Sequence, residues 1–407
     1  MTHILLIHQA FASLDEPGGT RHHEFARLLA LKGFRITIVA SPVSYLTGQT
    51  RIEKTSLRQS DADGSQVTIL RAYTYPALHR SYVHRVFSFL SFMVSSFLMA
   101  IRVKDVELVW GTSPPIFQGI TAWMVSRFKG VPFLFEVRDL WPAFAEAMGL
   151  LNNPFLIHTS RWLERFLYRH ANLVMVNSPG FIQHVQAKGV QRIELIPNGS
   201  DTSMFDPQER GEKFRLNHRL GDRFVALYAG AHGISNDLGV LLKAGAYLRD
   251  RRDITIVLIG DGKEKPKLIE EARQLKLDNI RFIPPISKNE MSQALAAADV
   301  CIAILRPVPL YATVYPNKVF DYMAAGRPVI LAIPGVIKEL IEEAQAGICV
   351  EPGDPAALAK AIAHLADHPE ECASMGANGR RCVEASFDRP VLADKLAALI
   401  EGMLNRL

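Results

Sequence analysis

Charged and aromatic side chains follow one short apolar run in the first half of the chain. The run Phe133–Glu136 leads directly into Arg138, Asp139 and Trp141, within the sequence VRDLWP. This arrangement puts a cation, a carboxylate and an indole at the carboxyl end of an expected strand, where parallel sheets bind ligands. A tryptophan alone is more often part of a core. Two adjacent ionisable residues at such a position favour a functional site.

Two glycine-bearing turns follow apolar runs in the second half. The first turn contains Gly230, His232 and Gly233, and the second, IGDGKEK, ends at Lys265. Glycine lets the backbone approach a ligand closely, and the N–H groups of strand-to-helix turns bind diphosphates. Either turn alone could be an ordinary connection. Two turns in one domain, followed by a third polar segment, favour a diphosphate site.

The third segment is VYPNKVFDYMAAGRPVI, and four of its residues could contact a nucleotide: Pro316, Asn317, Lys318 and Asp321. Lys318 and Asp321 are three residues apart, so they share one face of a helix. An ammonium at a helix start can neutralise a diphosphate, and a carboxylate one turn later can hold a ribose diol. The alternative is a surface ion pair between these two side chains.

A glycine pair, Gly18-Gly19, precedes an expected helix that carries Arg21, Glu24 and Arg27. A helix N-terminus behind a glycine turn favours an anion, although a glycine pair alone is usually only a turn. The dinucleotide fingerprint G-x-G-x-x-G is absent here, which argues against an NAD-dependent dehydrogenase.

Short apolar runs alternate with stretches of helical spacing, so the sequence predicts two doubly wound parallel sheets. The runs are 4–8, 35–40, 67–71, 108–110, 133–136, 173–177, 193–196, 224–229, 255–259, 280–283, 300–304, 328–331 and 347–350. A turn-rich stretch, 197–213, precedes the restart of the pattern. We expect an acceptor-side domain over residues 1–200, a donor domain over 201–385 and a C-terminal helix, 386–407, packing back towards the first domain. A site is expected in a cleft between the two domains.

The composition of the chain limits the kinds of partner and location that can be expected. Apolar residues make up 48% of the 407 residues, charged residues make up 21%, and the net charge is +5. Residues 1–201 hold 20 Lys and Arg against 14 Asp and Glu, so the excess of cations lies in the first half. This bias suits a solvated surface, an anionic membrane or a phosphate-bearing acceptor. Nucleic acid is disfavoured as a partner because no dense basic cluster with aromatics occurs.

The four cysteines form no C-x-x-C pair, so reduced thiols are expected. The first apolar run lacks a preceding basic region, so it does not read as a signal peptide, and a cytoplasmic location is expected.

The segment Val86–Ile101 contains 16 residues without a charge and is flanked by basic residues: Arg80, Arg85, Arg102 and Lys104. It is too short to span a bilayer, which takes about 20 apolar residues. Two interpretations stay open: a core helix, or an interfacial helix that docks on a membrane.

These motifs, in this order and spacing over nearly the whole chain, resemble the retaining glycosyltransferases of the GT-B fold, glycosyltransferase family 4. The resemblance is carried by PGGTRHHEFARLLALKGF, RDLWP, NSPGF, IPNGSDTSMF, YAGAHG, IGDGKEK, ALAAADVCIAIL and PNKVFDYMAAGRPVI. RDLWP and PNKVFDYMAAG are most similar to the branch that builds bacterial O-antigen and capsule repeats, amino-sugar transferases included.

The resemblance implies roles residue by residue. Arg138, Asp139 and Lys318 would be catalytic. Glu24 and Trp141 would lie on the acceptor side. The donor would contact Gly19, Gly230, His232, Gly233, Lys265, Pro316, Asn317 and Asp321.

The chain also departs from the family pattern. Thr313 stands where the family has a glutamate, and the second acid is Asp321 rather than glutamate. Ala231 and Leu238 stand about where an arginine and a lysine usually follow the first strand of the second domain, and Ala143 replaces the glutamate after RDLWP. His232, Lys265 and Lys318 are expected to replace the missing cations.

The expected reaction moves a sugar, for instance an N-acetylated amino sugar, from a nucleoside diphosphate to a hydroxyl of a glycan or polyprenyl-diphosphate-linked acceptor, with retention. Neither a metal nor another cofactor is expected, because fixed cations and helix N-termini can stabilise the leaving diphosphate. Asp61 and Asp63 have D-x-D spacing but lie in a polar loop. Two alternatives stay open: a nucleotide-sugar epimerase of the same architecture, and a non-catalytic nucleotide-sugar-binding protein. Peripheral contact with the inner face of the cytoplasmic membrane would suit a lipid-linked acceptor.

Overall fold

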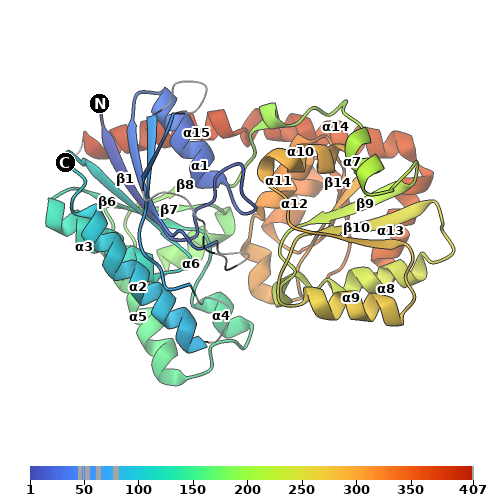
Figure 1. Cartoon of the computed structure of the whole chain (residues 1–407), viewed down its shortest axis with the longest axis horizontal. Helices are drawn as coiled ribbons and strands as arrows, with labels where there is room; N and C mark the ends of the chain where they lie inside the picture. The colour runs from blue at the N-terminus through green and yellow to red at the C-terminus, as the bar shows by residue number, and fades with distance from the viewer. Residues whose placement is uncertain (45–47, 49, 51–55, 61–65, 77–81, 406–407) are drawn as a thin grey trace. The chain divides into compact units, whose positions relative to one another are not determined.

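The computed structural model describes the chain except residues 45–47, 49, 51–55, 61–65, 77–81 and 406–407. Its contacts divide the chain into two compact units (Figure 1). Unit 1 comprises Met1–Ser13, Gly18–Pro197 and Pro390–Leu407. Unit 2 comprises Leu14–Pro17 and Asn198–Arg389. The C-terminal helix therefore belongs to unit 1. In the sequence, Asn198–Arg389 of unit 2 separates this helix from the rest of unit 1.

The sheet of unit 1 has the order β3-β4-β2-β1-β5-β6-β7-β8 in the described part of the chain. Every neighbouring pair is parallel except β3 and β4, which are antiparallel. The strands are β1 (His3–His8), β2 (Arg35–Ala40), β3 (Ser56–Ser60), β4 (Gln66–Arg71), β5 (Leu108–Ser113), β6 (Phe133–Val137), β7 (Leu173–Val176) and β8 (Ile193–Leu195). Burial on both faces explains why most of them read as continuous apolar runs.

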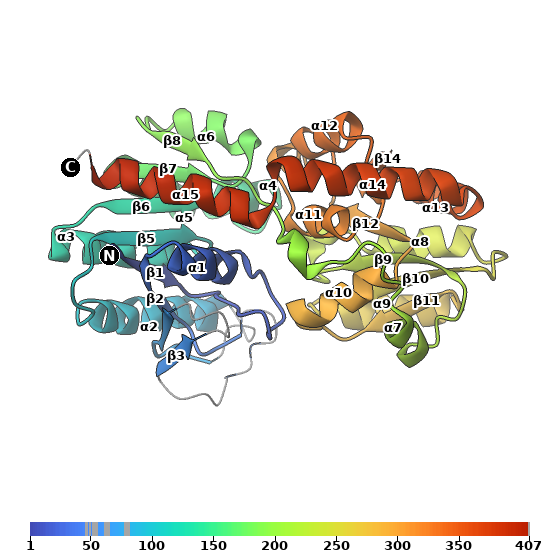
Figure 2. The ribbon, with the colours of Figure 1, turned by 90° about the horizontal axis from the view of Figure 1, so that it is seen from above.

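Helices cover both faces of this sheet (Figure 2). They are α1 (Arg21–Leu31), α2 (Tyr82–Ala100), α3 (Phe117–Lys129), α4 (Ala143–Ala147), α5 (Pro154–His170), α6 (Ile182–Gln186) and α15 (Arg389–Leu404). Ile4 and Leu6 of β1 pack in one core with Phe25 of α1 and with Leu396 and Ile400 of α15. The opposite face carries α3, with α2 and α5 beside it.

The close approach of α3 to the sheet depends on a glycine in β5. A Cβ atom at Gly111 would lie 2.6 Å from the Cβ of Ala122 on α3. Since real Cβ atoms do not come this close, only glycine lets α3 sit against β5 in this way.

Unit 2 is built on a six-stranded sheet of order β11-β10-β9-β12-β13-β14, all of whose neighbouring pairs are parallel. The strands are β9 (Phe224–Ala229), β10 (Ile254–Ile259), β11 (Ile280–Ile283), β12 (Val300–Ile304), β13 (Val329–Ala332) and β14 (Gly347–Cys349). The helices are α7 (Glu212–Asn217), α8 (Gly239–Tyr247), α9 (Lys265–Gln274), α10 (Lys288–Ala296), α11 (Asn317–Ala324), α12 (Val336–Glu343), α13 (Pro355–Asp367) and α14 (Pro369–Ser386).

The two faces of the unit 2 sheet build separate cores, because side chains of a strand alternate between its faces. Val225 and Leu227 of β9 pack with α10, α11 and α12, whereas Ala226 and Tyr228 pack with α8 and α13. The parallel, doubly wound architecture predicted from the spacing of apolar runs is confirmed for both units.

Strand order reverses direction once in each sheet, at the point where ligands bind in doubly wound folds. In unit 1 this switch point lies between β1 and β5, and in unit 2 it lies between β9 and β12. The loops that follow these four strands are therefore the expected ligand-binding segments.

Candidate functional site

A buried ionic cluster joins α1 to the carboxyl end of β6 in unit 1. Arg21 Nε donates to Glu136 Oε1 over 2.9 Å, and His22 Nε2 donates to Glu136 Oε2 over 2.5 Å. Burial alone would raise the pKa of Glu136, but the neighbouring His22 and Arg21 hold it below its usual value. Arg21 also donates to the carbonyl oxygens of Ile196 and Pro197. The cluster thus fixes the start of α1 against the strand that precedes the RDLWP segment.

Arg138 lies over the carboxyl ends of β1 and β5. Its guanidinium donates to Thr112 Oγ1 over 2.9 Å, to the carbonyl oxygen of Ser113 over 3.0 Å and to His8 Nε2 over 3.0 Å. Burial, together with the charges of His22 and Arg138, lowers the pKa of His8 well below its usual value, so the ring is neutral and can accept this hydrogen bond. The guanidinium is therefore held at the switch point of unit 1.

Asp139 follows Arg138 and is half-buried, with its Oδ1 atom excluded from solvent. Burial raises the pKa of its carboxyl group to about 6, although Arg138 and the Trp141 backbone oppose the shift. Its Oδ1 atom has no hydrogen-bond partner among the described residues. A buried carboxylate oxygen without a partner is available to a hydroxyl group of a ligand. Trp141 lies beside Phe117, with 6.2 Å between the ring centroids.

The two other site residues expected in unit 1 lie around the start of α1. Glu24 is buried and accepts a hydrogen bond from Thr20 Oγ1 over 2.5 Å, so part of its capacity is used inside the unit. Gly19 is exposed, and a Cβ atom there would meet nothing within 4 Å. The fold itself does not require glycine at position 19, whereas Gly18 has a φ of +149° and approaches Ala12.

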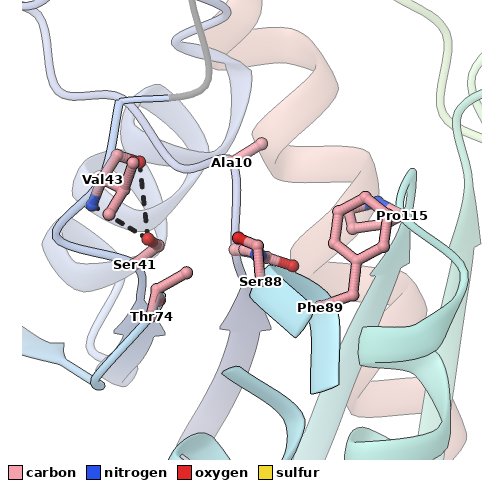
Figure 3. A pocket seen from close by; sticks show the side chains of 8 residues that line it. Ala10, Ser41, Val43, Thr74, Ser88, Phe89 and Pro115 are labelled. Carbon is pink, nitrogen blue, oxygen red and sulfur yellow. Dashed lines mark hydrogen bonds between the residues drawn. The ribbon is translucent and has the colours of Figure 1, made fainter. Parts of the chain in front are cut away.

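A small pocket opens at the switch point of unit 1 (Figure 3). Its lining comes from the loops after four strands and from α2: Gln9, Ala10, Ser41, Val43, Thr74, Ser88, Phe89 and Pro115. None of these side chains is charged, and three of them carry hydroxyl groups. Such a lining suits the hydroxyl groups of a neutral sugar better than a phosphate. The pocket could not be predicted from the sequence because its residues come from five separate segments.

In unit 2, the turns after β9 and β10 pack backbone to backbone. Gly230, Gly260 and Gly262 have φ values of +153°, +142° and +156°. A Cβ atom at Gly260 would lie 1.9 Å from the carbonyl oxygen of Gly230, and one at Gly262 would lie 2.4 Å from that of His232. These glycines are required both by their φ angles and by the contact between the turns.

Lys318, at the start of α11, extends into this glycine layer. Its Nζ atom lies 3.9 Å from the centroid of the Tyr228 ring. A Cβ atom at Gly230 would lie 2.5 Å from the same nitrogen, so the missing side chain makes room for the ammonium group. Burial lowers the pKa of Lys318 to about 7. No carboxylate forms an ion pair with Lys318 among the described residues, as expected for a cation kept for an anionic ligand.

His232 and Lys265 lie next to the same turns. The His232 side chain is fully buried, and neither ring nitrogen has a partner among the described residues. Burial, with the charge of Lys265, lowers its pKa to about 4, so the ring is neutral at pH 7. The Nζ atom of Lys265 donates to the carbonyl oxygens of Gly260 over 2.7 Å and Ile283 over 3.3 Å. Lys265 therefore ties the ends of β10 and β11 together and has one donor left for a ligand.

Asp321 pairs with a lysine that sequence analysis did not single out. Its Oδ1 atom accepts from Lys288 Nζ over 2.5 Å and from Ser200 Oγ over 2.7 Å. The Nδ2 atom of Asn317 approaches the other oxygen, at 3.5 Å. Asp321 does not pair with Lys318, so the alternative of a surface pair between those two residues is wrong. No spacing in the sequence links positions 200, 288 and 321.

The other expected site positions lie in the loop before α11. Pro316 caps the N-terminus of α11 without a side-chain hydrogen bond, and Asn198 Nδ2 donates to the carbonyl oxygen of Tyr315 over 2.7 Å. Thr313 donates through Oγ1 to the carbonyl oxygen of Leu310 over 2.7 Å. The loop is thus held by internal hydrogen bonds at the place where the family pattern has a glutamate.

The structure therefore brings the expected residues together within each unit. Unit 1 has Arg138, Asp139 and Trp141 after β6. Unit 2 has Lys318 beside Gly230, with His232 and Lys265 on the adjacent turns. Asp61 and Asp63 lie outside the described residues.

One cluster of metal-ligand side chains occurs among the described residues: His364 of α13, Glu371 of α14, and His368 between the two helices. His364 Nε2 lies 2.7 Å from Glu371 Oε2, and His368 Nδ1 donates to the carbonyl oxygen of His364 over 2.7 Å. None of the three residues belongs to the glycine turns or to α11. The cluster therefore has no direct part in the candidate donor site.

Two family models match the chain, one over most of each unit. The model described as "Glycosyl transferase 4-like domain" matches residues 18–199, and the model described as "Glycosyl transferases group 1" matches residues 223–368. The chain is a group 1 glycosyltransferase with the GT-B fold. This glycosyltransferase is 23% identical over 352 residues to the putative colanic acid biosynthesis glycosyl transferase WcaI of Escherichia coli K12, covering 83% of this chain and 86% of WcaI.

Solved structures of other proteins share the fold. Sucrose-phosphate synthase from Thermosynechococcus elongatus has a TM-score of 0.81 at 18% identity, covering 100% of both chains. HepE of Anabaena, solved in complex with UDP-glucose, has a TM-score of 0.73 at 17% identity, covering 99% of this glycosyltransferase and 100% of HepE. At these identities the similarity shows the fold alone.

Proposed function

We propose that this glycosyltransferase moves a sugar from a nucleoside diphosphate bound by unit 2 to a hydroxyl group of a glycan or polyprenyl-diphosphate-linked acceptor bound by unit 1. The transferred sugar is a hexose or an N-acetylated amino sugar, and its anomeric configuration is retained. The observation that carries the proposal is Lys318, a half-buried lysine beside a glycine turn with no carboxylate partner among the described residues.

The donor side follows from the chemistry of a diphosphate. Backbone N–H groups of the Gly230–Gly233 turn and the ammonium of Lys318 together offer hydrogen bonds and positive charge to the phosphate oxygens. Neutral His232 adds a donor and an acceptor, neither of which is used by another described residue. HepE is a neighbour of the same fold that was solved with UDP-glucose, which supports a nucleoside-diphosphate sugar as the donor class.

The proposal that unit 1 binds the acceptor rests on its uncharged pocket and on Asp139. The pocket offers hydroxyl and amide groups to a sugar ring (Figure 3). Asp139 has a free carboxylate oxygen and a pKa near 6, so it is largely ionised at pH 7 and can orient the attacking hydroxyl. Arg138, next to it, compensates the negative charge.

In the reaction, the bond between the anomeric carbon and the phosphate oxygen breaks, and the diphosphate leaves with the electron pair. The acceptor oxygen forms the new bond from the same face of the sugar, and its proton passes to the leaving phosphate. Positive charge from Lys318 stabilises the phosphate as this negative charge develops. No side chain in the described residues is needed as a covalent nucleophile in this scheme.

The product class we propose is a bacterial surface polysaccharide, such as an O-antigen, capsule or other lipopolysaccharide component. WcaI, a relative over most of its length, is named for colanic acid biosynthesis, which supports this class. Synthesis at the cytoplasmic face of the membrane would give the enzyme access to both the nucleotide donor and a lipid-linked acceptor.

The test is a binding and turnover screen of the full chain against a panel of nucleoside-diphosphate sugars. Donor affinity is measured by calorimetry, and products are identified with and without acceptor glycans. Lys318→Ala is expected to lower kcat/KM by about 10²-fold or more, because losses of transition-state charge partners cost this much. Lys267→Ala, which removes an exposed lysine of α9 in the same unit, serves as the matched control.

Three outcomes would contradict the proposal. Equal loss of activity in Lys318→Ala and Lys267→Ala would remove the special role of Lys318. A product that is an epimer of the donor, formed without acceptor, would identify an epimerase. Tight donor binding without any transfer or hydrolysis would identify a non-catalytic binding protein.

A further inference from the structure

Helix α2 exposes an apolar stripe to solvent. Phe87, Leu90, Val94 and Leu98 recur at intervals of three and four residues, so they share one face of the helix. Their exposed fractions run from 45% for Leu98 to 62% for Val94. The opposite side of α2 contains the fully buried Phe92 and Ser96. The stripe is therefore not the core-facing side of the helix.

The stripe continues onto the neighbouring helices of the same face. Phe128 of α3, and Phe155 and Trp162 of α5, are each at least 60% exposed, and Met124 of α3 is also exposed. Phe97 of α2 lies 6.4 Å from the Phe128 ring, and Trp123 of α3 lies 4.8 Å from the Phe166 ring of α5, so the three helices lie side by side. We call the outer surface of α2, α3 and α5 the three-helix face (Figure 1).

The other side of the same sheet does not share this property. Helices α1 and α15, which cover it, expose only Leu31 and Val391 among their large apolar residues in the described part of the chain. Exposed apolar side chains are normal when scattered, but a contiguous patch indicates an interaction surface. The contrast within one unit marks the three-helix face as such a surface.

Charge on the three-helix face is almost entirely positive. The exposed cations of its helices are Arg127, Arg161, Arg165 and Arg169. Arg161 pairs with Glu146 of α4, and the other three form no ion pair with a carboxylate among the described residues. Helices α2 and α3 contain no acidic residue, and Glu164 of α5 is buried against His184 and Lys188. An anionic partner with an apolar layer beneath its charges matches this combination.

We propose that the three-helix face docks on the surface of an anionic lipid bilayer. Its apolar side chains enter the boundary between headgroups and acyl chains, while its arginines contact lipid phosphates. No helix in the described part of the chain is both long and apolar enough to cross a membrane, so this contact is peripheral. An acidic protein would need a matching apolar surface that extends across three helices, whereas a bilayer supplies an apolar layer beneath its charges over its whole surface.

The same helix links this face to the pocket of unit 1. Ser88 and Phe89 of α2 line the pocket, while their neighbours Phe87 and Leu90 belong to the exposed stripe (Figure 3). If the acceptor is lipid-linked, which rests on the proposed function, docking would bring the membrane within one helix width of the pocket. Docking itself is independent of the identity of the acceptor.

The experiment is co-sedimentation of the full chain with vesicles. Vesicles of phosphatidylcholine with half phosphatidylglycerol are compared with vesicles of phosphatidylcholine alone, at low and high NaCl. We expect binding to the anionic vesicles, at least tenfold stronger than to neutral ones, and a loss of that binding as salt rises. Val94→Glu with Phe128→Glu should lower the partition coefficient at least tenfold, as should Arg127→Glu with Arg165→Glu.

Leu31→Glu with Val391→Glu is the matched control, because it places the same charges on exposed positions of α1 and α15. Thermal unfolding and donor affinity are measured for every variant, so that loss of folding or of the donor site is separated from loss of docking. The proposal is overturned if the wild-type chain ignores anionic vesicles at low salt, or if the control variant loses binding as much as the face variants. It is also overturned if the chain is a dimer in solution that the face variants convert to a monomer.

Discussion

The amino nitrogen of Lys318 lies 3.9 Å from the centre of the Tyr228 ring, in the space left by the missing side chain of Gly230. The lysine belongs to α11 and the ring to β9, so two segments about ninety positions apart build the candidate anion site. The ring gives the cation an electrostatic partner that a phosphate does not have to displace.

Donor affinity is expected to depend on pH through Lys318. Its pKa of about 7 means that the free enzyme loses the positive charge as pH rises through 7. A diphosphate favours the charged form, so the affinity should be highest below pH 7 and should weaken above it. Calorimetry from pH 6 to 9 measures this dependence. In Lys318→Met the affinity should be lower and nearly independent of pH over that range; an unchanged pH profile in this variant would assign the titration to another group.

Gly230→Ala should damage both the turn and the anion site. The new Cβ atom would lie 2.5 Å from Lys318 Nζ, and a φ of +153° is strained for alanine by about 1–3 kcal/mol. We expect at least tenfold weaker donor binding and a lower melting temperature. Gly239→Ala, at a position with open space and an ordinary φ, is the control and should keep both values. Equal behaviour of the two variants would show that the turn has room to relax.

Asp139→Asn should separate activity from stability. We expect kcat to fall by about 10²-fold, because the attacking hydroxyl loses an ionised partner. The carboxyl group has a pKa near 6 in the folded chain and near 3.9 when unfolded, so it stabilises the fold at low pH and this contribution is lost as pH rises through 6. The asparagine variant should therefore melt at the same or a higher temperature than wild type at pH 8. A lower melting temperature there would mean that Asp139 has a structural role.

The Lys288–Asp321 pair should be coupled in a double-mutant cycle. Both side chains are nearly excluded from water, so Asp321→Ala leaves a buried cation and should cost about 3–5 kcal/mol of unfolding free energy. Lys288→Met combined with Asp321→Ala should recover part of that loss. Denaturant unfolding of the two single variants and the double variant measures the coupling, and additive effects would exclude it. Donor binding by the double variant then tells whether Asp321 also contacts the nucleotide.

Transfer should continue in excess EDTA, because the candidate donor site offers lysine and backbone N–H groups to the diphosphate. His364→Ala with His368→Ala should leave turnover unchanged, since both residues lie on α13 and the loop after it. Loss of activity in chelator that Mg²⁺ or Mn²⁺ restores would contradict this expectation.

The parallel strands could be predicted from the sequence because burial on both faces makes them continuous apolar runs, as in Ile254–Ile259. The same reasoning missed β3, whose sequence SLRQS is short and polar and which pairs antiparallel with β4 at the edge of the sheet. Edge strands carry fewer apolar residues, so periodicity gives them little signal.

The candidate donor residues Gly230, His232 and Lys318 were predicted from turn chemistry and local spacing, and their role stays a prediction. The partners of Asp321 and Glu136 were not, because Lys288 and His22 are brought to these carboxylates by the packing of separate segments. Only part of the three-helix face could be predicted from the sequence. A helical stripe is visible in Val86–Ile101, whereas the exposure of Phe128 and Trp162 depends on which side of α3 and α5 meets the sheet. Arg80, one of the flanking cations of that segment, lies outside the described residues.

Helix α15 completes the apolar core of unit 1 with side chains such as Leu396 and Ile400, yet it follows residues 198–389 in the chain. During translation, Leu396 and Ile400 therefore emerge from the ribosome only after all of unit 2. Unit 1 therefore cannot complete its core until all of unit 2 has been synthesised, which departs from the usual N-terminal-first order of cotranslational folding. Until α15 is synthesised, the apolar residues of β1 and α1 that it covers stay exposed to solvent, and these are the surfaces that a chaperone would have to protect.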